Sequence, residues 1–246
     1  MFSKQIHFMK HLPNLITLGN LFCGSVAIIY AVQENFVSAA FFVILGIVLD
    51  FFDGFFARLL KVTGELGKQL DSLADMVTSG LVPGVIMFKL MQINLKSDPN
   101  SFIHEDPVLD VALIGLFITL AACLRLAKFN LDKRQTDQFI GLPTPAMCLV
   151  VISLPLIQKY SDVEFAKDLI ANNYFLIALT WVLSYLMNAE IFLFSLKFKD
   201  YSIAKNKIKY LFLIVSIILI FTLKYLAIPL LILFYIILSL FNRSSK

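Results

Sequence analysis

Long apolar runs separated by short polar segments cover most of this chain of 246 residues. A helix needs about 20 mainly apolar residues to cross the hydrocarbon of a bilayer. Segments that meet or approach this length are about Leu15–Val32, Phe36–Leu60, Leu70–Met91, Val108–Phe129, Leu142–Ile157, Tyr174–Phe194, Tyr210–Leu223 and Tyr225–Phe241. The pattern predicts an all-α, polytopic transmembrane helix bundle of about eight spans in one membrane domain. Residues 205–246 are expected to form a helical hairpin, because that apolar region is too long for one crossing.

The composition supports this class of protein and excludes two others. Hydrophobic residues make up 59% of the chain, and the formal net charge is +4. The lysines and arginines form short clusters between apolar runs, without the interleaved aromatic residues of a groove that binds nucleic acid. The three cysteines, Cys23, Cys123 and Cys148, have no CxxC spacing, so the sequence predicts neither a disulfide framework nor a zinc site.

The basic residues also predict an orientation in the membrane. If the amino terminus is cytoplasmic, the cytoplasmic segments hold sixteen of the 21 lysines and arginines. Short cytoplasmic loops are enriched in these residues. We therefore expect an integral protein of the cell membrane with both termini in the cytoplasm. Two short polar loops, Gln92–Asp106 and Gln158–Asn173, would lie on the far side.

The stretch from Asp50 to Asp75 is unusual because it places four aspartates next to apolar segments. Helical spacing puts them on two faces, each with a small residue beside them: Asp50, Asp53 and Ala57 on one helix, and Gly67, Asp71 and Asp75 on the next. A polar connector separates the two helices. We therefore expect an antiparallel pair whose acidic faces meet on the cytoplasmic side of the membrane.

Four carboxylates near lipid would repel one another unless they bound cations. Ligation by oxygen, without His or Cys, favours hard ions, so we expect Mg²⁺ or Mn²⁺. Arg58 is suited to bidentate contact with phosphate. Gly54, Ala57 and Gly67 leave room for a bulky polar ligand. The residues alone favour a site for metals and a diphosphate-bearing lipid, and they leave open an ion-paired helix turn or the cation pathway of a transporter.

The same run carries the motif D-x2-D-G-x2-A-R-x8-G-x3-D-x3-D. Its fixed positions are Asp50, Asp53, Gly54, Ala57, Arg58, Gly67, Asp71 and Asp75. With this motif the chain resembles the CDP-alcohol phosphatidyltransferase family. The resemblance implies a membrane core of mainly six helices, often a homodimer, with a site for two divalent ions.

The resemblance also implies roles for individual residues. The two ions would be held by Asp50, Asp53, Asp71 and Asp75. Of these, Asp75 would also act as the base toward the acceptor hydroxyl. The CDP moiety would be lined by Gly54, Ala57, Arg58 and Gly67. We expect Asn14, Thr17 and Ser79 either to contact the nucleotide or to form hydrogen bonds with helix backbones.

Further resemblance extends from about Leu12 to Ala146 and narrows the choice of acceptor alcohol. PNLITLGNLFCG begins at Pro13, which the pattern places at the start of a helix, RLAKFN begins at Arg125, and FIGLPTPA ends at Ala146. These stretches resemble the bacterial, integral-membrane phosphatidylserine synthases of the family. This implies CDP-diacylglycerol as donor and L-serine as acceptor. The segment around Met187–Lys197 departs from the more basic sequence that this resemblance leads us to expect.

A serine acceptor brings a carboxylate, which needs a cation close to the metal site. Arg125 and Lys128 lie at the cytoplasmic end of a predicted span, where they either bind this carboxylate or act only as topology determinants. Asn130 is a candidate to hold the serine amino group. We therefore expect phosphatidylserine and CMP as products. Glycerol 3-phosphate, inositol phosphate or choline as acceptor, and an ion-coupled transporter, remain the alternatives.

Overall fold

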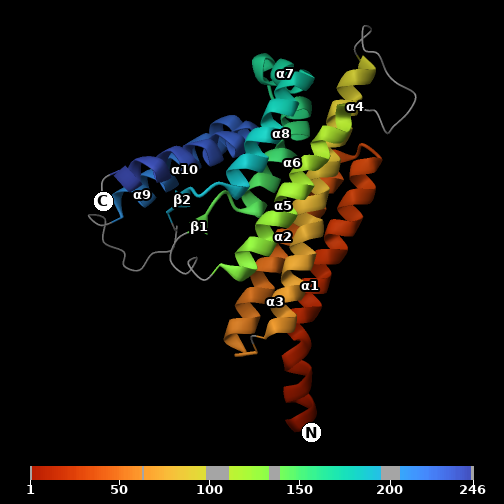
Figure 1. The fold of residues 1–246 in the computed structure, drawn as a ribbon, viewed down its shortest axis with the longest axis vertical. Helices are drawn as coiled ribbons and strands as arrows, with labels where there is room; N and C mark the ends of the chain where they lie inside the picture. The colour runs from red at the N-terminus through yellow and green to blue at the C-terminus, as the bar shows by residue number, and fades with distance from the viewer. Residues whose placement is uncertain (1, 63, 98–110, 133–138, 195–205, 245–246) are drawn as a thin grey trace.

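The computed structural model describes residues 2–62, 64–97, 111–132, 139–194 and 206–244, and these residues form a helical bundle with one small strand pair (Figure 1). Its elements are α1 (Phe2–Val32), α2 (Phe36–Leu59), α3 (Glu65–Asp75), the π-helical segment η1 (Met76–Leu81), α4 (Val82–Ser97), the 3₁₀ segment η3 (Val111–Leu116), α5 (Phe117–Leu131), β1 (Phe139–Ile140), α6 (Thr144–Tyr160), α7 (Glu164–Ala171), α8 (Asn173–Asn188), β2 (Phe192–Leu193), α9 (Lys207–Leu223), the 3₁₀ segment η4 (Lys224–Leu226) and α10 (Ala227–Ser244). The all-α prediction is confirmed.

The predicted number of about eight spans is higher than the number of helices long enough to cross a membrane. Five helical segments of the described chain qualify by length and composition, or six if the pair α7–α8, bent by 83°, forms one span. α6 is apolar but has only 17 residues, a rise of about 26 Å against about 30 Å of hydrocarbon. Each predicted segment nevertheless contains a helix.

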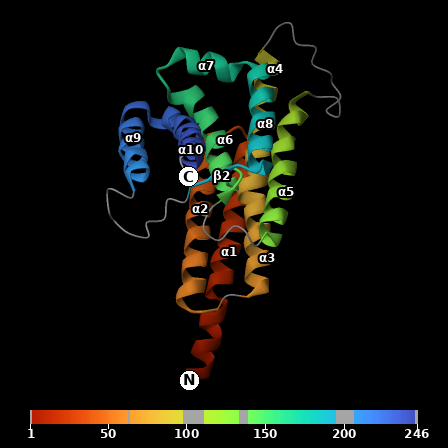
Figure 2. The same ribbon diagram turned by 60° about the vertical axis from the view of Figure 1, so that its left-hand side comes forward.

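Caps and turns explain where several helices begin and end. The Asn35 side chain accepts a hydrogen bond from the Ser38 amide at the start of α2 (3.2 Å), and the Asn172 side chain accepts one from the Tyr174 amide at the start of α8 (2.8 Å). α9 ends at Leu223, because the next residue, Lys224, has a φ of 49° that is incompatible with a continuing helix. α10 then folds back along α9, and the two helices form a hairpin beside the bundle (Figure 2).

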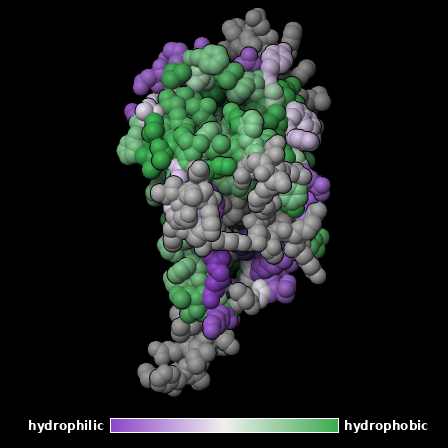
Figure 3. Space-filling model, turned by 90° about the vertical axis from the view of Figure 1, so that its left-hand side faces the viewer, coloured by the Kyte–Doolittle hydropathy of each residue, from purple (hydrophilic) through white to green (hydrophobic). Residues whose placement is uncertain are grey.

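α6 is the central helix of the bundle, because its residues from Met147 to Ile157 are almost all buried. α4 adds the fully buried side chains of Ile86, Met87 and Leu90 to the same core. The outer faces of α1 and α2 instead expose large apolar side chains, among them Phe22 and Phe41. Figure 3 shows a broad hydrophobic zone on one face, with hydrophilic residues gathered below it. This distribution suits an integral membrane protein.

Two local expectations from the sequence are wrong. α1 begins at Phe2, so Pro13 lies inside this helix and not at its start. A proline inside a helix removes one backbone donor, which long membrane helices tolerate. The stretch Gln158–Asn173 is not simply a loop, because α7 forms there with Ile170 buried against the bundle. In the other expected loop, residues 92–97 continue α4, and residues 98–106 lie outside the described residues.

The arrangement of the first three helices opens a space on one side of α1. α1 packs closely against both α2 and α3, whereas α2 and α3 make almost no close backbone approach to each other. The chain passes between them through Lys61, which has a φ of 53°, and through the extended Gly64. The acidic run therefore spans a gap and does not form a close-packed helix pair.

Candidate active site

The four aspartates of the motif lie on the two helices that border this space. Asp50 and Asp53 are on the last turns of α2, and Asp71 and Asp75 are on α3. One carboxylate oxygen from each of Asp50, Asp53 and Asp71 lies within 4.8 Å of the other two. These three side chains can therefore hold a metal ion together. Asp75 lies one turn farther along α3 and lines the same cavity.

The donor set fits a hard divalent cation. All the candidate ligands are carboxylate oxygens, which Mg²⁺ and Mn²⁺ prefer. Within the described part of the chain, no lysine or arginine forms an ion pair with these four aspartates. A bound cation would offset the negative charge that the protein side chains leave uncompensated. The set suits Mg²⁺ and Mn²⁺ equally.

Side chains from α1 hold two of the carboxylates. The buried Thr17 hydroxyl donates a hydrogen bond to Asp53 Oδ2 (2.5 Å). Asn20, which is fully buried one turn farther along α1, donates from Nδ2 to Asp75 Oδ1 (3.4 Å). α1 therefore orients one carboxylate from each acidic helix.

The π-helical segment η1 follows Asp75 directly and fixes it against α1. Thr78 in η1 donates a hydrogen bond to the Asn20 carbonyl (3.1 Å). Gly24 faces Thr78 so closely that a Cβ atom there would lie 2.9 Å from Thr78 Cα. Such π-helical turns are frequent at functional sites. Here the turn joins the end of the acidic helix to the part of α1 around Asn20 and Gly24.

A cavity of about 620 Å³ opens between α1, α2, α3 and α5 and contains all four aspartates. Its size is in the usual range for a ligand pocket. The predicted nucleotide-contacting residues in its lining are Asn14, Thr17, Gly54, Ala57, Arg58 and Gly67. The space beside the two glycines is open on the cavity side, since a Cβ at Gly54 or Gly67 would meet no atom closer than 3.4 Å.

Arg125 of α5 forms part of the wall opposite α2. Its side chain is almost completely buried, with the residue 7% exposed, and Nη1 donates to Thr144 Oγ1 (2.9 Å). Nε has no partner among the described residues. The guanidinium carbon lies 5.8 Å from the centre of the Phe129 ring, a cation–π arrangement. A buried guanidinium with free donors at the edge of a cavity is suited to bind an anionic group.

The remaining predicted residues lie outside this cavity. Ser79 is fully buried in η1, and its hydroxyl has no partner among the described residues. Asn130 donates from Nδ2 to Ser72 Oγ (2.8 Å), and its carbonyl accepts from Lys68 Nζ (2.7 Å). Lys128 lines a second, neighbouring cavity. Asn130 thus links α5 to α3 in this structure, and its expected contact with the serine amino group stays a prediction.

Two residues of the site, Asn20 and Thr144, were not predicted from the sequence. Asn20 continues the face of α1 that Asn14 and Thr17 occupy, so helical spacing could have indicated it. Thr144 gave no comparable signal, because its contact with Arg125 depends on how α6 packs against α5.

Comparison with known proteins agrees with the motif. A family model described as CDP-alcohol phosphatidyltransferase matches residues 10–186. CDP-diacylglycerol–serine O-phosphatidyltransferase of Bacillus subtilis is 37% identical over 147 residues, which cover 59% of this chain and 76% of that protein. The protein of the same name from Helicobacter pylori strain J99 is 36% identical over 155 residues, 62% of this chain and 60% of the relative.

A more distant relative is archaetidylserine synthase of Methanothermobacter thermautotrophicus, 27% identical over 178 residues, 69% of this chain and 68% of the relative. The family match runs from residue 10 of α1 through most of α8 and ends before α9. It includes every aspartate of the site. The chain therefore belongs to the CDP-alcohol phosphatidyltransferase family.

Proposed function

We propose that the protein transfers the phosphatidyl group of CDP-diacylglycerol to the hydroxyl of L-serine, giving phosphatidylserine and CMP. The observation that carries this proposal is the convergence of Asp50, Asp53 and Asp71 in a cavity that also holds Asp75 and Arg125. Family membership supports the reaction type. The names of several relatives support serine as the acceptor.

The reaction breaks one bond at phosphorus and forms another. Asp75 would take the proton from the serine hydroxyl, whose oxygen attacks the phosphorus nearer diacylglycerol. The bond between that phosphorus and the oxygen of CMP breaks, and CMP leaves with the electron pair. Asn20, by donating to Asp75 Oδ1, would keep the carboxylate in one orientation during proton transfer.

The metal ions would be held by Asp50, Asp53, Asp71 and Asp75, and when bound they would supply positive charge next to the phosphoryl oxygens. Thr17 would fix the Asp53 carboxylate through its hydrogen bond. Arg58, which is exposed at the mouth of the cavity, would contact the diphosphate. Gly54, Ala57, Gly67 and Asn14 would line the CDP moiety.

The purified protein in detergent or nanodiscs tests this proposal directly. It is incubated with CDP-diacylglycerol and Mg²⁺ or Mn²⁺, and with one acceptor at a time: L-serine, glycerol 3-phosphate, inositol phosphate or choline. We expect phosphatidylserine and an equal amount of CMP with serine, and no lipid product with the other acceptors. If a different phospholipid formed in place of phosphatidylserine, the proposed type of reaction would stand, but L-serine would not be the acceptor.

We further propose that the site opens on the cytoplasmic side of the cell membrane, with both termini in the cytoplasm. The distribution of lysines and arginines supports this orientation. Protease digestion of a carboxy-terminal tag in intact and in permeabilised cells tests it, and cleavage only after permeabilisation is expected.

We also propose a homodimer, which the family resemblance supports. Its test is the mass of the purified protein after subtraction of bound detergent.

A further inference from the structure

A second cavity, of about 380 Å³, lies beside the candidate active site. One wall is the end of α5 and the residue after it, and the other is the end of α8 and the turn that follows. The polar and charged residues of its lining are Arg125, Lys128, Asp132, Asn188 and Glu190. Only Arg125 and Lys128 of this set were expected from the sequence to have a role.

The two cavities share a wall. Arg125 and Phe129 line both of them. The Arg125 guanidinium is buried, gives its single hydrogen bond within the described chain to Thr144, and keeps Nε without a partner. A small anionic group in the second cavity would therefore meet Arg125 directly, next to the cavity that contains Asp75.

The second cavity carries both signs of charge. Arg125 and Lys128 supply cations from α5, while Asp132 and Glu190 supply carboxylates from the segments that follow α5 and α8. A zwitterion matches this lining, since it has a carboxylate for the cations and an ammonium group for the carboxylates. Glycerol 3-phosphate and inositol phosphate bring anionic charge only, and choline brings a cation only. The charges thus favour an amino acid among the candidate acceptors.

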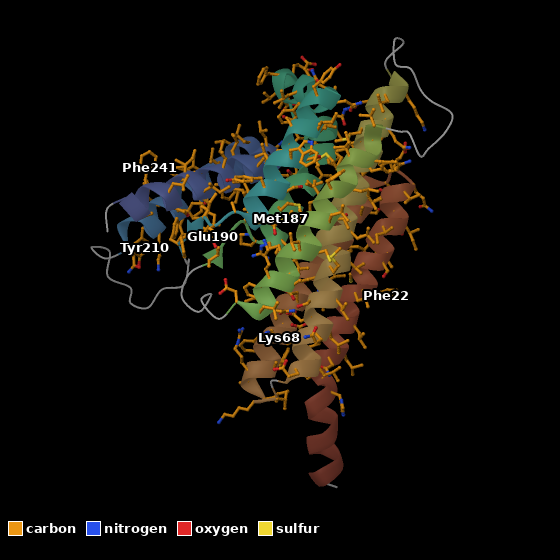
Figure 4. All side chains as sticks on the ribbon, in the orientation of Figure 1. Phe22, Lys68, Met187, Glu190, Tyr210 and Phe241 are labelled. Atoms are coloured by element: carbon orange, nitrogen blue, oxygen red, sulfur yellow. The ribbon has the colours of Figure 1, made fainter. Side chains whose placement is uncertain are left out.

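Hydrogen bonds hold the end of α8 and the turn that carries Glu190 in place. β1 pairs with β2 in antiparallel register, Phe139 opposite Leu193. The Gly141 amide donates to the Ile191 carbonyl (2.8 Å). Asn188 Nδ2 donates to the Ala121 carbonyl of α5 (3.0 Å). Glu190 lies between α8 and the strand pair (Figure 4). This wall of the cavity is therefore built from fixed elements.

Gly141 is required for this arrangement. It has a φ of +73°, and a side chain there would collide with the Met187 carbonyl. Glycine adopts this conformation without strain and lets the segment before α6 pass directly against the end of α8. The same glycine thus lets the chain after β1 lie against Met187, which lines the cavity.

We propose that this second cavity is the subsite for the amino-acid acceptor, in which Arg125 binds the carboxylate and Glu190 binds the ammonium group. The proposal rests on the proposed function and adds to it a specificity-determining residue, Glu190, in the segment Met187–Lys197, which departs from the expected sequence. The serine hydroxyl would then point across the shared wall toward Asp75.

The test compares Glu190→Gln with the wild-type protein and with Glu164→Gln, a matched change on α7, where the glutamate is exposed and pairs with Lys167. Initial rates are measured with serine and with 3-hydroxypropionate, which has the same carboxylate and hydroxyl but no ammonium group. For Glu190→Gln we expect KM for serine to rise roughly tenfold, as for loss of one partly exposed charged hydrogen bond. KM for CDP-diacylglycerol and the rate with 3-hydroxypropionate should stay unchanged. Glu190→Asp should recover part of the serine affinity.

Two results would overturn the subsite, and they are distinguishable. If wild type forms phosphatidylserine but Glu190→Gln keeps the wild-type KM for serine, the subsite is wrong and the proposed function stands. If wild type releases CMP without forming phosphatidylserine, the proposed function fails and the subsite fails with it. Because Glu190 is exposed, circular dichroism and elution volume should show the same fold for all variants.

Discussion

The helices around the aspartates and the carboxy-terminal hairpin are both strongly apolar, yet they are packed in opposite ways. In an apolar stretch of 18 residues within Glu65–Lys96, 56% is buried in the molecule, compared with 6% in such a stretch of Ile208–Phe241, although the latter span is the more apolar of the two. In lipid, apolarity alone does not drive helices together, because the hydrocarbon is as apolar as the side chains. Close packing must come from van der Waals fit, which small residues favour at helix crossings, and from polar contacts.

The distribution of glycine agrees with this reasoning. In the bundle, Gly24 lies against Thr78, Gly84 against Thr119, and Gly115 against the backbone of Phe88. Residues 206–244 contain no glycine at all. The hairpin is joined to the bundle partly through the Tyr235 hydroxyl, which donates to the Phe194 carbonyl (2.6 Å). We therefore expect changes in the bundle to affect chemistry and folding, and changes in the hairpin to affect chemistry little.

The largest expected effect is the removal of divalent metal. With EDTA the transferase activity should fall to background, because four carboxylates in one cavity cannot bind a diphosphate without cations. Added Mg²⁺ or Mn²⁺ should restore it. Asp71→Asn should also weaken binding of Mn²⁺, measured by electron paramagnetic resonance without any substrate. Asp162→Asn, in an exposed position outside both cavities, is the control. Full activity in the presence of EDTA would show that the reaction does not need a metal ion.

The next largest effect is expected for Asp75→Asn. The amide cannot accept the proton of the serine hydroxyl, so kcat should fall by a hundredfold or more, in the range of roughly 10² to 10⁴ for general base catalysis. Thermal stability should change little, since Asn20 can still contact the amide oxygen. The measurement is CMP release under saturating substrates. A variant with near-normal kcat would show that another group accepts the proton.

The sequence predicts the acidic site better than it predicts its surroundings. Helical spacing and the motif bring the four aspartates together, because both depend on residues close in the chain. Asn20 and Thr144 act through contacts between helices that are far apart in the sequence. The turn at Glu190 depends on a strand pair of only two residues per strand. Such short strands have no recognisable alternation of apolar and polar residues.

The predicted boundaries fail where local geometry decides. Apolar runs indicated each membrane helix, but they could not distinguish the 17-residue α6 from a full span. They also could not show that α6 would be the central, nearly buried helix. The π-helical turn after Asp75 was not predicted either, because its close fit to Gly24 depends on the packing of η1 against α1.

A smaller effect on stability is expected for Gly24→Ala. The new Cβ would lie 2.9 Å from Thr78 Cα, a backbone atom that cannot move aside as the end of a flexible side chain can. Overpacking of this kind costs about 1–3 kcal/mol, against a gain in helix propensity of about 1 kcal/mol. Gly19→Ala is the matched control, since its Cβ would meet only the flexible end of Leu49 at 3.3 Å. Thermal unfolding in detergent should rank Gly24→Ala below wild type and Gly19→Ala at or above it. The reverse order would mean that α1 and η1 are not closely packed.

The smallest effect is expected in the hairpin, for Tyr235→Phe. The change removes the hydrogen bond to the Phe194 carbonyl but keeps the ring contacts of Tyr235 with Phe194 and Phe212. One such hydrogen bond contributes about 1 kcal/mol, so the unfolding temperature should fall slightly. Tyr185→Phe, at a residue that is 70% exposed, should leave the unfolding temperature unchanged. Both variants should keep kcat and KM for serine, because neither tyrosine lines either cavity. A loss of activity in Tyr235→Phe alone would show that the hairpin positions the strand pair beside Glu190. The hairpin would then be part of the active region, and the contrast between the two regions would be wrong.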